Sequence, residues 1–105
     1  MILTTKSRDG KLYSATASFE NGKVTVLQGS TINRLNAKGF NPPTKVLNLR
    51  NTESLFDGSI LLEDIDFDSL STAATFVTGR VANGKIVWKT EDGKYVKYTL
   101  EQGGN

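Results

Sequence analysis

The first third of the chain alternates polar and apolar residues, and this alternation predicts a β-hairpin. Residues 12–19 alternate strictly enough to form a strand with one buried face. Asn21-Gly22 follows, and this pair favours a two-residue turn because both central residues of a type I′ turn need positive φ. Residues 24–28 then predict the returning strand. Residues 1–10 are weakly patterned, so we expect either a disordered arm or an edge strand there.

Residues 30–43 are rich in Ser, Asn, Gly and Pro and predict a long loop. Loops longer than about 12 residues are uncommon in compact domains and are often functional. This loop carries two cations, Arg34 and Lys38, which we treat as candidate binding residues.

Two further segments predict helices. Pro43 suits the first residue of a helix whose apolar stripe runs to Phe56, and Gly58 suits a left-handed cap after it. The second helix is expected over residues 71–79, with a serine as its N-cap. Its small alanines would let it lie close to a sheet. Short strands are expected between the helices, at 59–62 and 65–67.

The last third of the chain predicts another hairpin. Residues 85–90 and 94–100 suit strands, with Asp92-Gly93 as the turn between them. The predicted fold is therefore α+β, in the order β-β-α-β-β-α-β-β. It is an antiparallel sheet built from three hairpins, with two short helices packed on it. All 105 residues suit one domain, with a flexible tail over 101–105.

The composition removes several classes of chemistry. The chain has no cysteine and no histidine, which excludes disulfides and thiolate zinc sites and takes away the commonest general base. We therefore expect no cofactor, no metal and no enzymatic activity. The acidic group at 63–68 lacks the glycine and terminal glutamate of a calcium loop, and a solvated hairpin is the simpler interpretation.

Hydropathy argues against a membrane partner. The mean hydropathy is −0.31, and no apolar run approaches the roughly 20 residues that a spanning helix needs. The first residues also lack the basic and apolar regions of a signal peptide, so we expect a cytoplasmic protein.

Charge is distributed unevenly along the chain. The net charge is +2, but residues 1–50 carry eight Lys and Arg against two acids, which gives +6 and leaves −4 for the rest. Such a molecule can turn a basic face toward a phosphate backbone. The alternatives are two solvated surfaces of opposite sign, or molecules paired head to tail.

Arg80 and Asn83 form the first candidate pair. Arginine can contact phosphate or guanine, and asparagine can pair with adenine. The structural alternatives are that Arg80 caps the preceding helix and that Asn83 supplies positive φ in an Asn-Gly turn. Trp88 is either a stacking platform or a core residue, and Lys89 should point to the face opposite Trp88.

Ser69 and Ser71 form a second candidate pair at the start of a predicted helix. Their hydroxyls could donate to a phosphate there, because helix N-termini favour anions. The alternative is that they only cap the helix.

Several spaced motifs over residues 24–95 resemble domain-of-unknown-function family 4357. The matching segments share their order and spacing with the family, and they are residues 26–30 (VLQGS), 55–61 (LFDGSIL), 67–74 (FDSLSTAA), 79–84 (GRVANG) and 88–94 (WKTEDGK). Some positions differ: Gln28 replaces a lysine, Leu70 replaces a proline, and Lys85 stands where the family carries an aromatic residue.

The family is also similar to the restriction-enzyme and adenine-methylase-associated (RAMA) domain. That similarity implies an accessory domain of DNA modification, restriction or nuclease proteins. We therefore expect a small module that binds nucleic acid. The alternative is a protein-interaction or oligomerisation module with no nucleic-acid role.

Overall fold

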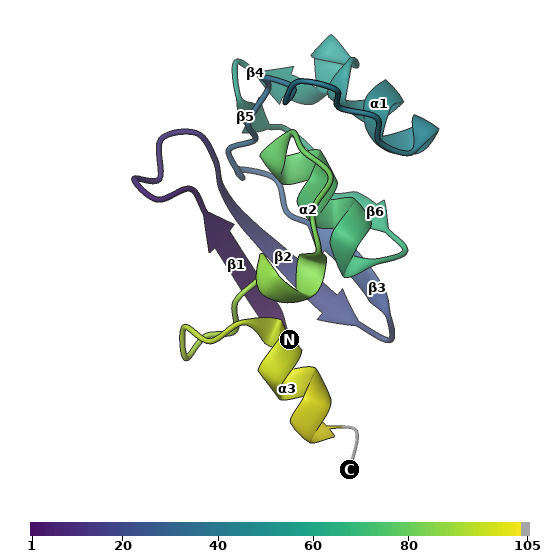
Figure 1. The fold of residues 1–105 in the computed structure, drawn as a ribbon. Helices are drawn as coiled ribbons and strands as arrows, with labels where there is room; N and C mark the ends of the chain where they lie inside the picture. The colour runs from purple at the N-terminus through teal and green to yellow at the C-terminus, as the bar shows by residue number, and fades with distance from the viewer. Residues whose placement is uncertain (104–105) are drawn as a thin grey trace.

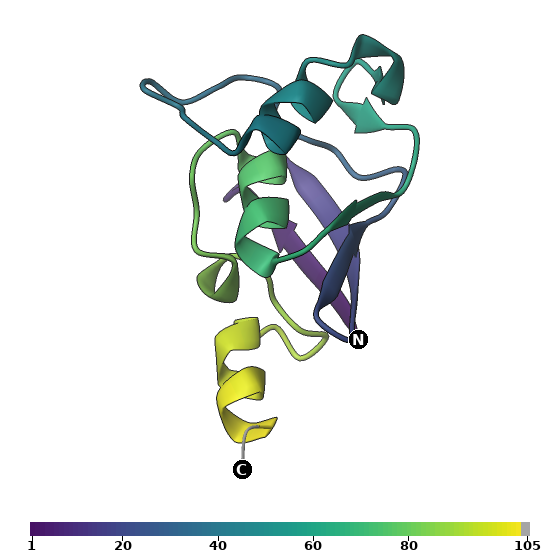
Figure 2. The ribbon, with the colours of Figure 1, turned by 90° about the vertical axis from the view of Figure 1, so that its right-hand side faces the viewer.

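The computed structural model describes residues 1–103 and has the expected α+β architecture. A four-stranded antiparallel sheet in the order β1-β2-β3-β6 carries helix α2 on one face (Figure 1). Helix α1 and the β4–β5 hairpin lie at one end of the molecule and α3 at the other (Figure 2). The strands are β1 (Ile2–Lys6), β2 (Ser14–Glu20), β3 (Lys23–Val26), β4 (Phe56–Asp57), β5 (Ile60–Leu61) and β6 (Ile65–Phe67). The helices are α1 (Thr44–Arg50), α2 (Leu70–Thr78) and α3 (Val96–Gly103), with short 3-10 turns η1 (Glu53–Leu55) and η2 (Gly84–Ile86).

The first hairpin forms as predicted. Asn21 and Gly22 both take positive φ, 51° and 81°, and connect β2 to β3. The start of the chain is the edge strand β1, which pairs antiparallel with β2. Its Leu3 and Thr5 are buried, whereas the alternate residues are exposed, so one face of the strand joins the core.

Helix α2 forms the centre of the core. Ser69 is its N-cap, and Ala73 and Ala74 are fully buried, which confirms the expected close packing on the sheet. The Phe76 ring packs on Phe67 of β6, with 5.2 Å between ring centroids. Among residues 1–103, every helix is too short or too polar to cross a bilayer.

The predicted second hairpin is wrong in its pairing. Segments 59–62 and 65–67 do contain strands, but β5 pairs with β4, and β6 pairs with β3 of the main sheet. Gly58 is not a helix cap, because α1 ends at Arg50. It takes φ 63° in the two-residue turn between β4 and β5, a conformation that suits glycine.

The predicted third hairpin is also wrong. Lys89 makes single bridges to Thr4 and Tyr95, and the chain then enters α3 at Val96. Val96 and Leu100 pack on the core while Tyr98 is exposed, which is the spacing of a helix. Of the predicted tail, residues 101–103 belong to α3 and 104–105 lie outside the described residues.

The C-terminal end of α2 is satisfied by other parts of the chain. A helix leaves its last carbonyls without helical partners, and these are costly to bury unpaired. Arg50 Nη1 donates to the carbonyl of Phe76 at 2.7 Å. Asn33 donates to Val77 through its N–H (2.9 Å) and to Thr78 through Nδ2 (3.0 Å). The N–H of Ala37 donates to Gly79 at 2.8 Å.

Arg50 is a buried cation with no carboxylate partner among residues 1–103. Its Nη2 and Nε donate to Asn36 Oδ1 at 2.7 and 3.2 Å, so it joins α1, α2 and the loop that precedes α1. Burial lowers the pKa of Arg50, and the charge of Arg34 lowers it further. An arginine remains protonated even so. The negative end of the α2 dipole stabilises that charge.

We predict that Arg50→Met strongly destabilises the protein. The substitution leaves the Phe76 carbonyl and the Asn36 side chain unpaired, which should cost about 3 kcal/mol of unfolding free energy. Arg50→Lys should cost less because one ammonium group replaces part of the network. Urea unfolding followed by the fluorescence of Trp88 measures both. Lys38→Met, in the exposed part of the same loop, is the matched control and should change stability by less than about 0.5 kcal/mol. Equal urea midpoints for Arg50→Met and the parent would contradict this account.

Candidate functional site

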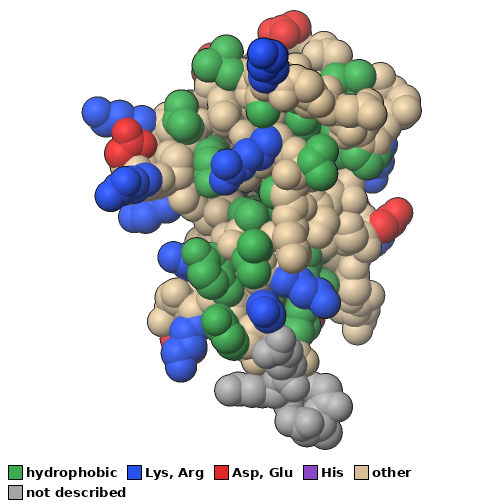
Figure 3. All heavy atoms as spheres, viewed as in Figure 1, with side chains coloured by type: hydrophobic (Ala, Val, Ile, Leu, Met, Phe, Trp, Pro, Cys, Tyr) green, Lys and Arg blue, Asp and Glu red, His purple; other side chains and the backbone are tan. Residues whose placement is uncertain are grey.

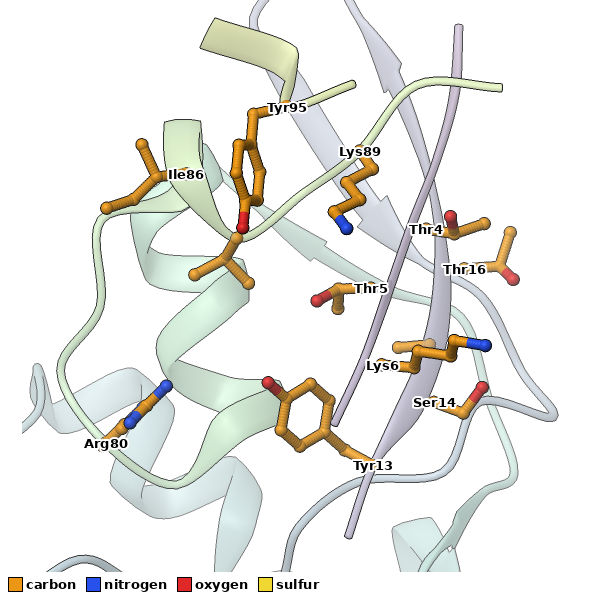
Figure 4. Close-up of a pocket in the computed structure, with 12 residues that line it drawn as sticks. Thr4, Thr5, Lys6, Tyr13, Ser14, Thr16, Arg80, Ile86, Lys89 and Tyr95 are labelled. Atoms are coloured by element: carbon orange, nitrogen blue, oxygen red, sulfur yellow. The ribbon is translucent and has the colours of Figure 1, made fainter. Parts of the chain in front are cut away.

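A cleft of about 430 Å³ opens between the outer edge of β1 and the segment 80–95. In Figure 4 the labelled side chains of Arg80, Tyr13, Thr5, Lys89 and Tyr95 surround it on the side of the sheet that carries α2. Thr4, Lys6, Ser14 and Thr16 project from the opposite side of the two strands (Figure 4). The cleft is therefore built from three separate parts of the chain: the β1–β2 pair, the residue after α2, and the approach to α3.

The edge of β1 fixes the position of Lys89. The N–H of Thr4 donates to the Lys89 carbonyl at 2.9 Å, and the N–H of Lys89 donates to the Thr4 carbonyl at 2.8 Å. Backbone groups alternate in direction along a strand, so the N–H and C=O of Lys6 point to this same outer edge. The Lys89 ammonium lies over the Tyr95 ring, 5.1 Å from its centroid.

Two of the cations that line the cleft, Arg80 and Lys89, lack an acidic partner among the side chains of residues 1–100. Arg80 is exposed, and its guanidinium makes no hydrogen bond or ion pair within this part of the chain. Within the same residues, the ammonium group of Lys89 contacts only the Tyr95 ring. The cleft is lined by no Asp or Glu of the described chain. Its potential is therefore positive, and an anion would enter without displacing a carboxylate.

Thr5 adds a hydroxyl to the wall of this cleft. The residue is only 7% exposed, but its Oγ1 is not a buried unpaired atom: it makes no hydrogen bond among the described side chains and is reached by solvent. Figure 4 shows the hydroxyl directed toward the cleft. A hydroxyl that faces the cleft and is not used by the described fold is open to a ligand there.

Two further hollows adjoin the cleft. One of about 410 Å³ shares Tyr13 and Arg80 with it and continues past Arg8. The other, of about 520 Å³, shares Lys89 and Tyr95 with it and continues to Tyr98 of α3. The three hollows are neighbours through these shared lining residues, and together we call them the basic groove. Figure 3 shows Lys and Arg side chains interspersed with hydrophobic ones over the middle of one face, with acidic side chains toward its margins.

Three of the predicted binding residues serve the fold instead. Ser69 Oγ accepts from the N–H of Thr72 at 3.0 Å, and Ser71 Oγ accepts from the N–H of Gly84 at 2.9 Å. Asn83 Oδ1 accepts from the N–H of Lys85 at 3.1 Å and so caps η2. The prediction of positive φ at Asn83 is wrong, since its φ is −85°. The capping alternative therefore describes Ser69, whereas Ser71 joins η2 to α2 and the cap that Asn83 provides was not predicted.

Trp88 is a core residue. It is 0% exposed, and its Nε1–H donates to the Leu70 carbonyl at 3.1 Å. A ring with no accessible face cannot stack on a base, so the platform interpretation is wrong in this structure. Lys89 does point away from the core, as predicted.

The two loop cations do not reach the basic groove. The Arg34 guanidinium lies 3.9 Å from the Phe56 ring centroid and donates to the Gly58 carbonyl (2.9 Å) and to Glu53 (3.0 Å). It therefore holds the β4–β5 hairpin to the loop. Lys38 is exposed on that loop and lines none of the three hollows.

The predicted acidic hairpin is engaged within the fold as well. Asp64 accepts from the N–H of Gln28 at 2.8 Å, and Asp66 accepts from the Thr25 hydroxyl at 2.6 Å. Within residues 1–103, no three Asp or Glu side chains come close enough to hold a metal ion.

Of the polar side chains in the motif GRVANG, only the arginine is not used by the described fold; Val81 is exposed but apolar. A Cβ on Gly79 would lie 2.3 Å from the Leu35 carbonyl oxygen, where the loop crosses the end of α2. A Cβ on Gly84 would lie 2.2 Å from the carbonyl carbon of Leu70. Asn83 is a cap. Arg80 alone combines exposure with a polar side chain that the described fold does not use.

Of the residues predicted from the sequence, Arg80 and Lys89 line the same cleft. Sequence reasoning did not single out the other lining residues Thr5, Tyr13, Tyr95 and Tyr98, because they come together only through the pairing of Thr4 with Lys89, 85 positions apart in the chain.

The chain belongs to the family described as Domain of unknown function (DUF4357), whose family model matches residues 6–99. The match is longer than the 24–95 of the sequence resemblance, and it takes in β2 and most of the basic groove. Comparison with curated proteins gave no match, and comparison with solved structures gave none.

We predict that Gly84→Ala destabilises the protein by about 2 kcal/mol, because the added carbon overlaps the backbone of Leu70 and must push η2 away from α2. Gly93→Ala is the matched control. Gly93 has positive φ (82°), but a methyl group there would meet no atom within 4 Å, so only the conformational cost of about 1 kcal/mol applies. Thermal or urea unfolding compares them. A larger loss for Gly93→Ala than for Gly84→Ala would refute the packing role.

Proposed function

We propose that this DUF4357 domain is a nucleic-acid-binding module that contacts the phosphate backbone through the basic groove. The observation that carries the proposal is the convergence of Arg80 and Lys89, from separate segments, in a cleft that no acid of the described chain lines. Arginine and lysine provide most of the affinity of proteins for the phosphate backbone. Neither side chain is needed to hold the fold, so both are available to a ligand.

The arrangement of charge over the sheet supports this proposal. Strands β1 and β6 are the two opposite edges of the main sheet. Lys6 and Arg8 lie at the β1 edge, whereas Asp64, Asp66 and Asp68 lie at or beside β6. A molecule with segregated charge orients its basic side toward a polyanion as it approaches.

The resemblance to the RAMA domain supports DNA as the polymer. It suggests an accessory role beside restriction, modification or nuclease domains. The residue that best fits such a role is Arg80, since arginine can contact both phosphate and guanine.

Self-association is the second candidate, and the same segregated edges favour it. The acidic β6 edge of one molecule would meet the basic β1 edge of another, and such a head-to-tail contact does not close. Light scattering at low and high salt separates the two candidates. A monomer at every protein concentration would exclude self-association.

We predict that Arg80→Ala and Lys89→Ala each weaken DNA binding several-fold and lower the slope of log affinity against log salt by about 1. Loss of one phosphate contact is the reason. Fluorescence anisotropy with labelled oligonucleotides in a salt series measures both quantities. Lys23→Ala is the matched control, because Lys23 is an exposed cation at the β2–β3 turn, outside the groove. Equal losses for all three variants would show that net charge, rather than this cleft, controls the affinity. No binding of any oligonucleotide at low salt would exclude the proposed function.

A further inference from the structure

Resting on the proposed function, we infer that the basic groove takes an unpaired strand, with a phosphate against Thr5, Arg80 and Lys89 and a base on the ring of Tyr98. Single-stranded DNA and single-stranded RNA both offer these phosphates and unpaired bases. We base this inference on the residues that line the groove, on its concave shape and on the polar groups in it that the described fold does not use.

The central cleft has the groups that a phosphate requires. Lys89 and Arg80 supply charge, and the outward-facing N–H of Lys6 and the hydroxyl of Thr5 supply directed donors. The Thr5 hydroxyl is the most informative of these groups. Thr5 is almost wholly buried as a residue, but the hydroxyl oxygen itself is reached from the cleft and makes no hydrogen bond among the described side chains. A phosphate oxygen in the cleft would satisfy it.

The hollow toward α3 suits a base instead. Tyr95 and Tyr98 line it, and Tyr98 is 51% exposed with no ring or cation found against it among the described residues. Lys89, Lys94 and Asp92 also line this hollow, so its charge does not exclude phosphate. The two tyrosine rings, rather than the charge, distinguish it as the site for a base.

This alternation of rings and cations points to unpaired rather than paired nucleic acid. Bases in a duplex are stacked on each other and show only their edges, whereas unpaired bases show a face to an aromatic side chain. Proteins that bind single strands combine a basic groove along the backbone with rings on which successive bases stack. Duplex readers insert a helix or ribbon into a DNA groove, and the site here is concave.

Anisotropy titrations of the full chain test the inference with three probes: a dye-labelled 12-nucleotide DNA strand, the same sequence as a duplex, and its RNA counterpart. We expect either single strand to bind at least ten-fold more tightly than the duplex, and the stronger of the two identifies the polymer. Equal or tighter duplex binding would overturn the inference while leaving the proposed function intact. Absence of binding by all three probes at low salt would overturn both.

Substitutions at the base site separate stacking from charge. Tyr98→Ala should weaken single-strand binding about ten-fold, because stacking on one ring contributes about 1–3 kcal/mol. Tyr98→Phe keeps the ring and should bind like the parent. Duplex affinity should be unchanged in both variants. Equal affinities of Tyr98→Ala and Tyr98→Phe for the single strand would overturn the stacking role.

Thr5→Val tests the phosphate site without disturbing the packing. Valine keeps the shape of threonine and removes only the hydroxyl, which makes no bond within the described chain, so the urea midpoint should not fall. Single-strand affinity should fall several-fold. Thr44→Val, at the exposed start of α1 and outside the three hollows, is the control and should bind like the parent. Unchanged affinity of Thr5→Val would overturn the assignment of its hydroxyl, and a loss of stability that matches the loss of affinity would show a structural role instead.

Discussion

The last carbonyls of α2 have no hydrogen-bond partners within the helix, and most of this structure depends on how they are satisfied. They lie inside the molecule, away from bulk water, and must be satisfied by protein groups. Arg50, Asn33 and the backbone of the preceding loop satisfy them, and so α1 and the loop are held where they are. The loop then crosses so closely over Gly79 that no side chain fits there. The following residue, Arg80, is directed outward as a result.

The N-terminal end of α2 positions the other wall of the cleft. The Leu70 carbonyl accepts from Trp88, and Ser71 accepts from the N–H of Gly84. These bonds hold the segment that delivers Lys89 to the edge of β1. One helix therefore sets the positions of both cations, Arg80 from its last turn and Lys89 from its first. The motif residues Ser69, Ser71, Asn83 and Trp88 all make hydrogen bonds within the fold.

Local signals in the sequence predicted what depends on local chemistry. The Asn21-Gly22 turn and the Ser69 cap act within a few residues, and both are found as expected. The prediction for the last third of the chain was wrong because the apolar pattern of residues 96–100 fits both a strand and a helix. Val96 and Leu100 lie on the same face in either structure. The exposure of Tyr98 identifies the helix, and burial is decided by the rest of the fold. The sequence predicted two cations of the cleft but not its other wall. That wall depends on the bonds between Thr4 and Lys89, which lie near opposite ends of the chain and have no local signal.

Those two bonds between Thr4 and Lys89 also protect the sheet from other chains. An uncovered edge strand offers its backbone groups to any passing strand, and this is a common route to aggregation. Here the segment that carries Lys89 covers the middle of β1, and the cationic side chain of Lys6 lies beside the part that stays open. Natural sheets use lysine at edges in this way. The same short stretch of backbone thus forms one wall of the cleft and covers the edge of the sheet.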